Sequence, residues 1–152
     1  MVWSQGRPIA CLAWSSAPRH LASRDRFIGW SDSARQRNVN LLTNNTRFLI
    51  LPWVAIPNLA SHVLARVLAR LPGDWAARFG TPPWLVETFV DPARFHGTCY
   101  RAANWQRLGP TFGSGKQGPG YIYHGVVKEV YVYVLAPRFR HRIGCVQPPV
   151  GP

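Results

Sequence analysis

The sequence has few acidic residues, with 6 Asp and Glu against 18 Lys and Arg, which gives a formal net charge of +12 over 152 residues. This imbalance excludes a neutral surface. A folded protein this basic usually binds a polyanion, most often nucleic acid. The alternative use for such a charge is docking on an acidic protein partner.

Cysteine is also scarce. Cys11, Cys99 and Cys145 lie far apart in no CxxC or Cys/His ligand spacing, and neither His96 nor His124 has a ligand partner at a suitable spacing. The sequence therefore predicts no metal site. An odd number of cysteines without a disulfide framework is typical of a reducing compartment, so we expect a cytoplasmic protein.

Long apolar runs are missing, because Pro52 and Pro57 interrupt the longest one. No membrane span is expected. Hydrophobic residues still make up 47% of the chain, enough to form a core. We expect one domain over residues 1–143, followed by an unstructured tail over residues 144–152. Because a strand-like run, Pro8–Trp14, begins almost at once, we expect the domain to lack its N-terminal part and this strand to lack partners.

Apolar patterning predicts strands and helices that alternate along the chain. The expected strands are Ile9–Trp14, Arg47–Leu51, Trp84–Val90, Trp105–Leu108 and Val126–Leu135. The expected helices are a first one from Ser31 or Ser33 to about Leu42, a second over Asn58–Leu71, and short ones over Trp75–Phe79 and Tyr100–Ala103. Asn44 and Asn45 should end the first helix, Pro72 and Gly73 the second, and Pro110–Gly125 should be a flexible loop. This order predicts an α/β or α+β fold, a mixed sheet flanked by helices.

One acid stands out because it lies inside a predicted strand. Glu87 shares a face with Leu85 and Phe89. Burial among apolar side chains would raise its pKa and suit it to act as a general base. A structural carboxylate paired with Arg47 or with a helix end is the alternative.

Polar and aromatic side chains gather around the second predicted strand. Asn44, Asn45 and Arg47 lie near its start and Trp53 follows its end. Amides, a guanidinium and an indole can read or stack a base, although turn chemistry alone explains the asparagines. His62, near the start of the long helix, is a further candidate for phosphate binding or proton transfer, and the alternative is a solvated side chain.

Arginine runs make up the rest of the predicted nucleic-acid surface. Arg24 and Arg26 lie close to Phe27 and Trp30, a combination of charge and aromatic rings that phosphate grooves use. A stretch without acids lies between Asp91 and Glu129, and its basic residues are Arg94, Arg101, Arg107 and Lys116. A last run, Arg138, Arg140 and Arg142, would face one way if it were a strand.

The order of elements resembles the second half of the GCN5-related N-acetyltransferase fold, most clearly over Thr88–Asp91 and Ala102–Gly109. That resemblance implies an acyl-CoA pyrophosphate held at the start of the long helix, and Tyr100 as general acid. The corresponding loop, Val54–Ala60, has no glycine, and Pro57 has no N–H to donate. We therefore predict no cofactor, and acetyl-CoA only if the protein is an acyltransferase.

A closer resemblance is carried by five blocks in order. They are RDRFIGWS (Arg24–Ser31), NNTRFLILPWV (Asn44–Val54), PNLASHVL (Pro57–Leu64), ETFVD (Glu87–Asp91) and GTCYRAANW (Gly97–Trp105). Together they are similar to the DruA family, over roughly Gly6 to Phe139. That family belongs to Druantia anti-phage systems, and its domain also accompanies transposase-like proteins.

The resemblance implies a nucleic-acid-associated component of a prokaryotic defence or mobile-element system, with other defence or transposase proteins as partners. An acyl-CoA-dependent N-acyltransferase with Glu87 as base and Tyr100 as acid is the first alternative. A scaffold without catalysis, docked on an acidic protein, is the second.

Overall fold

The computed structural model describes residues 1–112, 114–117, 120–123 and 125–143. The strands are β1 (Val2–Ser4), β2 (Arg7–Ser16), β3 (Leu42–Ile50), β4 (Leu85–Val90), β5 (Gln106–Pro110), β6 (Ser114–Gln117), β7 (Gly120–Tyr123) and β8 (Glu129–Val134). The helices are α1 (Ala22–Ile28), α2 (Asp32–Asn38), a 3-10 turn η1 (Val39–Leu41), α3 (Leu59–Phe79), α4 (Thr98–Ala102) and α5 (Phe139–Arg142). The expected tail at 144–152, with Cys145, and the side chains of His124 and Lys116 lie outside what the structure describes.

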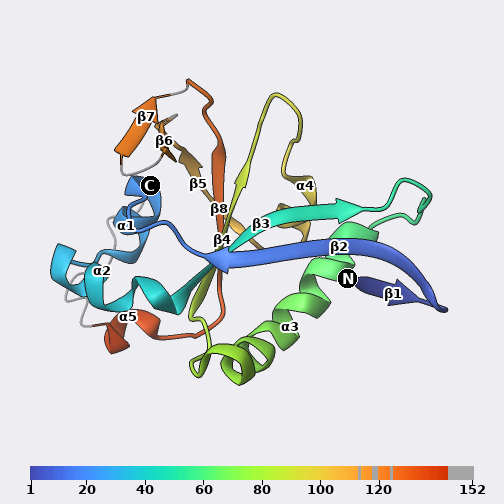
Figure 1. Cartoon of the computed structure of the whole chain (residues 1–152), viewed down its shortest axis with the longest axis horizontal. Coiled ribbons are helices and arrows are strands. Elements are labelled where there is room, and N and C mark those ends of the chain that lie inside the picture. Colours follow the sequence, from blue (N-terminus) through green and yellow to red (C-terminus); the bar gives the residue numbers. More distant parts are fainter. Residues whose placement is uncertain (113, 118–119, 124, 144–152) are drawn as a thin grey trace.

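A six-stranded mixed sheet forms the centre, in the order β1-β2-β3-β4-β8-β5 (Figure 1). Its neighbouring strands pair antiparallel except β3 and β4, which are parallel and are joined by the long helix α3. The strands β6 and β7 form a separate antiparallel pair. The predicted class, a mixed α/β sheet flanked by helices, is confirmed.

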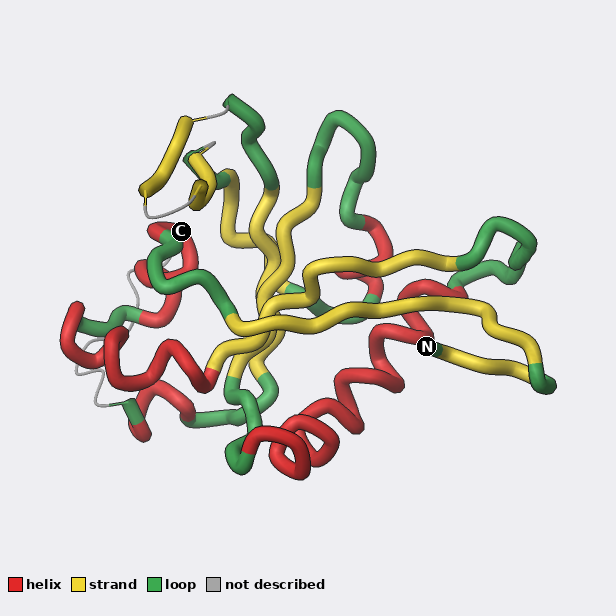
Figure 2. The backbone as a smooth tube through the Cα atoms, viewed as in Figure 1, coloured by secondary structure: helices red, strands yellow, loops and turns green. Residues whose placement is uncertain are grey.

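Helices cover both faces of the sheet (Figures 1 and 2). Each face of the sheet has its own core, and alternate side chains of strand β4 enter these two cores. Leu85 packs with Ile28 and Phe139 in the core under α1, α2 and α5. Val86 packs with Leu64 and other residues of α3 and α4 in the second core. Consecutive residues of β4 thus belong to opposite faces, which decides where each polar side chain lies.

The first strand does have partners, so that expectation is wrong. Strand β2 pairs with β1 on one side and with β3 on the other. The β1–β2 turn is made by Gln5 and Gly6, whose φ angles of 48° and 75° are those of a two-residue hairpin turn. The expectation that the domain lacks its N-terminal part stays a prediction.

Helix α3 continues through Pro72 to Phe79, so the expected stop at Pro72 and Gly73 is wrong. A proline fits helical φ and removes one backbone hydrogen bond. The apolar stripe of the helix carries on past it, with Leu68 and Leu71 buried and Trp75 packed against the same core. Tertiary packing on both sides of the proline outweighs the local cost.

Three other boundaries differ from expectation. Asn44 and Asn45 lie inside β3 instead of ending a helix. The expected loop over Pro110–Gly125 contains the β6–β7 pair, and the last strand, β8, is only six residues long. Arg138, Arg140 and Arg142 belong to the start and body of α5, so they do not form one face of a strand.

A buried ion pair joins α1 to the sheet. Arg24 and Glu87 are both fully buried, and Nη1 of Arg24 lies 3.3 and 3.2 Å from the two carboxylate oxygens of Glu87. The remaining N–H groups of Arg24 donate to the side chain of Asp25 and to the carbonyls of Pro18 and Arg19. Every donor of Arg24 is thereby used inside the protein.

No helix within the described residues is long and apolar enough to cross a membrane.

We expect Arg24→Ala to destabilise the fold by about 3–5 kcal/mol, because it leaves the buried Glu87 carboxyl without its ion-pair partner. Arg26→Ala removes the same charge from an exposed position on the same helix and should change stability by less than about 0.5 kcal/mol. Urea denaturation of both variants measures the difference. Equal stability of the two would contradict a structural role for Arg24.

Candidate functional site

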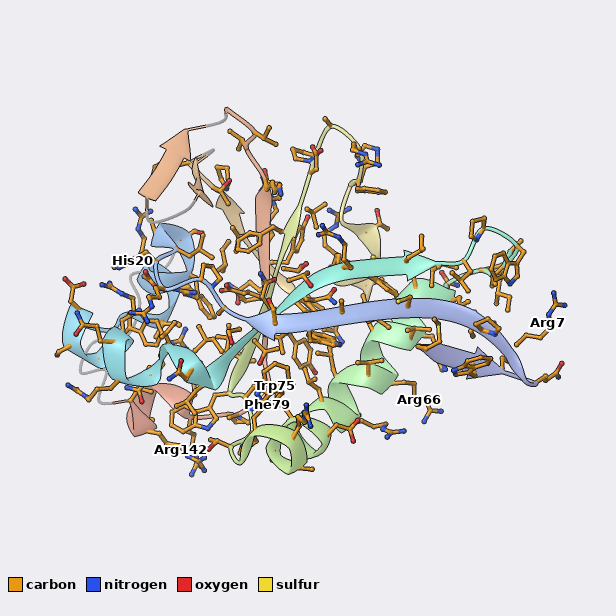
Figure 3. The ribbon with its side chains drawn as sticks, in the orientation of Figure 1. Arg7, His20, Arg66, Trp75, Phe79 and Arg142 are labelled. Carbon is orange, nitrogen blue, oxygen red and sulfur yellow. The ribbon has the colours of Figure 1, made fainter. Side chains whose placement is uncertain are left out.

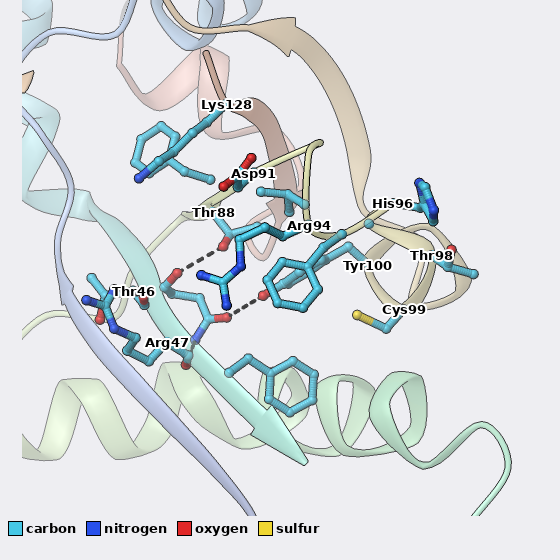
Figure 4. Close-up of a pocket in the computed structure, with 16 residues that line it drawn as sticks. Thr46, Arg47, Thr88, Asp91, Arg94, His96, Thr98, Cys99, Tyr100 and Lys128 are labelled. Carbon is cyan, nitrogen blue, oxygen red and sulfur yellow. Dashed lines mark hydrogen bonds between the residues drawn. The ribbon is translucent and has the colours of Figure 1, made fainter. Parts of the chain in front are cut away.

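A cavity lies where the two parallel strands part. Strands β3 and β4 are paired from Leu42 with Leu85 to Asn45 with Thr88, and no further. Beyond that point a cavity of about 720 Å³ opens between them (Figure 4). Its walls come from residues 45–48 of β3, residues 88–90 of β4, the loop over residues 91–97 and the start of α4.

A β-bulge at Thr46 accompanies the parting of the strands. Opposite β3, Ala13 pairs with Arg47 and Trp14 with Asn45, so Thr46 is an extra residue. A bulge bends its strand and increases its twist. Beyond the bulge, β3 stays paired with β2, while β4 stays paired with β8. The cavity lies between the diverging ends of β3 and β4.

Asn45 closes the inner end of the cavity. Its buried amide nitrogen donates to the carbonyls of Ala13 and Arg47, which flank the bulge. Its side-chain oxygen accepts a hydrogen bond of 2.9 Å from the hydroxyl of Tyr100, and its backbone oxygen accepts one of 2.9 Å from Thr88 Oγ1. One residue therefore ties β2, β3, β4 and α4 together.

Tyr100 lines the cavity from α4 and is mostly buried. Burial raises its pKa from 10 to about 12, against a smaller opposing effect of a hydrogen bond with Thr88. The phenol therefore keeps its proton at neutral pH and acts as a hydrogen-bond donor. Burial also raises the pKa of the neighbouring Cys99 thiol, which makes it a poor nucleophile.

Positive charge surrounds the open part of the cavity. Arg47, Arg94 and Lys128 line it, with Asp91 as its single acidic residue. Figure 4 shows Arg94 reaching into the space in front of the Asn45–Tyr100 hydrogen bond, with Arg47 and Lys128 on either side. Oδ1 of Asp91 accepts a hydrogen bond from the backbone N–H of Ala93, which fixes the turn that carries Arg94.

Gly97 holds that loop close to the sheet. Its φ is +66°, and a Cβ at this position would lie 2.5 Å from the hydroxyl of Tyr131. Arg101 supports the same loop, because its guanidinium donates to the carbonyl of His96 and to the hydroxyls of Tyr131 and Thr98. The loop carrying Arg94 is thus fixed at both of its ends.

Glu87 is not part of this cavity. It lies on the face of β4 that meets α1, whereas Thr88 and Tyr100 lie on the other face. Burial raises the pKa of Glu87 from 4.5 to about 7, against the opposing attraction of Arg24. The structure therefore does not bring the proposed base Glu87 together with the proposed acid Tyr100, and the partner of Glu87 is Arg24 instead of Arg47.

The other predicted residues are dispersed. Asn44 faces the α1 side beside Glu87, and its buried Oδ1 has no hydrogen-bond partner in the described structure. Arg107 makes two 2.8 Å hydrogen bonds to Glu129 at the sheet edge. Trp53, in the loop before α3, is 60% exposed and outside the cavity lining, while Arg26 on α1 and His62 on α3 are exposed on separate helices. Of the residues predicted to belong to the nucleic-acid surface, Asn45, Arg47 and Arg94 meet at the cavity.

The fold brings two residues to the cavity, Asp91 and Lys128, that the sequence analysis does not identify as site residues. Arg94 is identified there only as one residue of a basic stretch. Asp91 and Arg94 follow the end of β4 closely, and residues just beyond a strand end commonly line a ligand site. No local signal in the sequence places Lys128 beside them. Among the described residues, no three His, Cys, Asp or Glu side chains gather as a metal site requires.

Comparison with solved structures finds acetyltransferases at low similarity. The chain is similar to a mutant of agmatine N-acetyltransferase in its apo form, with 11% identity, a TM-score of 0.45, and coverage of 87% of this chain and 73% of that one. It is similar to the Drosophila melanogaster polyamine N-acetyltransferase, with 11% identity, a TM-score of 0.44, and coverage of 87% and 72%. No curated protein matches.

The fold and cavity define an α/β domain with a cleft between two diverging parallel strands. Residues 1–119 match the family model described as Druantia protein DruA. The chain belongs to the DruA family.

The raised pKa of Glu87 predicts a pH dependence of stability. The pKa of Glu87 in the folded state, about 7, exceeds the unfolded value of 4.5. Between these two pH values, the folded state therefore binds more protons than the unfolded state. The contribution of Glu87 is thus fully present below pH 4.5 and is lost as the pH rises through about 7. Between about pH 5 and pH 8, the melting temperature of the wild type should fall relative to that of Glu87→Gln.

Glu129→Gln, which alters an acid in a partly exposed ion pair, serves as the control and should keep the wild-type decline. Parallel curves for the wild type and Glu87→Gln would show that the carboxyl titrates normally in the folded protein.

Proposed function

We propose that this protein is a nucleic-acid-associated component of a Druantia-type anti-phage defence or mobile-element system, and that its cleft engages phosphate groups. The observation that carries the proposal is the cavity between β3 and β4, where three basic side chains meet one acid beside aromatic rings. Phosphate backbones are recognised by Lys and Arg, and bases by stacking on aromatic side chains.

The distribution of charge over the chain supports the same proposal. All acids except Asp91 already pair with an arginine, and these ion pairs involve only Arg24, Arg35, Arg70 and Arg107. Most of the basic residues that the structure describes therefore form no ion pair and add to a positive field. Such a field raises the encounter rate with a polyanion and makes its binding sensitive to salt.

Aromatic rings stand at the rim of the cavity. The Phe95 ring is 58% exposed, and the guanidinium carbon of Arg94 lies 5.3 Å from its centre. An exposed ring with a cation above it offers a stacking surface next to a phosphate ligand. Trp53, in the loop between β3 and α3, is a second exposed ring outside the cavity lining, and it serves as a test of whether binding extends past the cleft.

The charge of the cleft predicts a specific salt dependence. Arg94→Ala and Lys128→Ala should each weaken binding of single-stranded and duplex oligonucleotides and reduce the slope of log affinity against log salt by about one. Arg66→Ala, a change on the exposed side of α3 away from the cleft (Figure 3), is the matched control and should leave the slope nearly unchanged. Fluorescence anisotropy at several salt concentrations measures both quantities.

Affinity that does not respond to salt, or that all the substitutions leave unchanged, would reject the nucleic-acid proposal and assign the charge to an acidic protein partner. Trp53→Ala separates the two kinds of contact. If Trp53 stacks on a base, its loss should cost about 1–3 kcal/mol while the slope is kept, because no charge is removed.

One observation favours the alternative of an acyl-CoA-dependent N-acyltransferase: the Tyr100 hydroxyl lines a cleft between diverging strands. The start of α3 argues against it. Pro57 has no N–H, and the N-cap residue Asn58 adopts a left-handed conformation (φ 59°) with no capping side-chain hydrogen bond. We expect titration calorimetry with acetyl-CoA to detect no binding in the micromolar range. Micromolar binding at moderate salt would favour the acyltransferase instead.

A further inference from the structure

The cleft is closed at one end. The last paired residues of the parallel strands are Asn45 and Thr88, and the side chain of Thr88 is bonded across to β3. Behind them the sheet is continuous, because Asn45 also bonds to β2 and to Tyr100. A polymer that enters between β3 and β4 therefore meets a hydrogen-bonded wall.

The cavity is also small for a continuous nucleic acid. Its volume of about 720 Å³ falls within the range of small-molecule sites. It can take a terminal nucleotide of a strand, whereas a duplex is limited to its rim. A nucleic-acid strand that passed through the cleft would need an exit on its far side, where β3 and β4 are paired.

The charges of the lining suit a doubly charged group. Arg47, Arg94 and Lys128 against Asp91 leave a surplus of two positive charges. A phosphodiester within a strand carries one negative charge, whereas a phosphate monoester at a strand end carries about two at neutral pH. Arg94 is well placed to bind it, because its guanidinium extends into the cleft and makes no ion pair with a described acid (Figure 4).

We propose that the cleft is an end-binding site that holds the phosphate monoester at the terminus of a nucleic-acid strand. The terminal phosphate lies against Arg94, with Arg47 and Lys128 supplying the remaining charge. The terminal base lies toward Phe95 at the rim. This inference rests on the proposed function, since it specifies which part of a nucleic acid the cleft receives.

The test compares four forms of one labelled single-stranded oligonucleotide with the full chain. They carry a 5′-phosphate, a 3′-phosphate, hydroxyl groups at both ends, or no ends because the strand is circular. At moderate salt we expect one phosphorylated form to bind about tenfold more tightly than the hydroxyl form, the effect of one charged hydrogen-bonding contact. The circular strand should bind no better than the hydroxyl form. A preference for the 5′-phosphate or for the 3′-phosphate shows which end of the strand the cleft holds.

A variant pair links that preference to the cleft. Arg94→Ala should abolish the difference between phosphorylated and hydroxyl ends, while Arg66→Ala should keep it. Both side chains are exposed, so neither change should disturb the fold, and the melting temperatures of both variants verify this.

Three outcomes are distinguishable. A preference for phosphorylated ends that Arg94→Ala removes supports the proposal. Equal binding of all four oligonucleotides, or a preference that survives Arg94→Ala, overturns the end-binding site and leaves nucleic-acid association standing. Absence of binding to every form rejects the proposed function as well.

Discussion

The cleft depends on one buried amide. Asn45 stands where the sheet divides, and its side chain satisfies the backbone groups that the bulge at Thr46 takes out of the ladder. A bulge leaves backbone carbonyls unpaired, and unpaired groups are costly when buried. An amide can donate twice and still accept from Tyr100. Aspartate in its ionised form could not replace it, because it has no N–H to donate.

The two faces of β4 place a buried ion pair and a cavity lining on consecutive residues. Glu87 and Arg24 form an ion pair sealed from solvent on the α1 face. Thr88 and Tyr100 line the cavity on the other face. A one-residue change in the register of β4 would exchange these environments, exposing the ion pair to the cleft and burying the threonine under α1. The buried pair thereby specifies the register on which the cleft depends.

Much of the fold could be predicted from local patterns. The apolar run of β4, the amphipathic stripe of α3 and the short helix at Tyr100 all appear at their expected places, because each has a clear period or strong flanking residues. The errors occur where distant contacts outweigh local preference. Pro72 is held in a helix by packing on both sides, and Asn45 is held in a strand by hydrogen bonds to β2, neither of which a local pattern contains.

The site was predicted less completely than the fold. Arg47 was identified because it sits beside amides and an aromatic residue in sequence. Arg94 and Lys128 come from segments more than thirty positions apart, and only the antiparallel pairing of β4 with β8 brings those segments together. Arg24 looked like a surface cation, since a lone arginine on a short helix gives no sign of a carboxylate 63 positions away. Side-chain partners across a sheet require the topology before they can be assigned.

The position of β8 in the sheet has a consequence for how the chain is made. Glu129–Val134 lies between β4 and β5, both of which leave the ribosome before it. Until it arrives, each of these strands has an open edge, and open edges pair with other chains. At ordinary rates of synthesis, the segment from the end of β5 to the start of β8 takes about one to four seconds to make. A nascent chain of this protein therefore passes through an interval in which its central strand is present but only half paired.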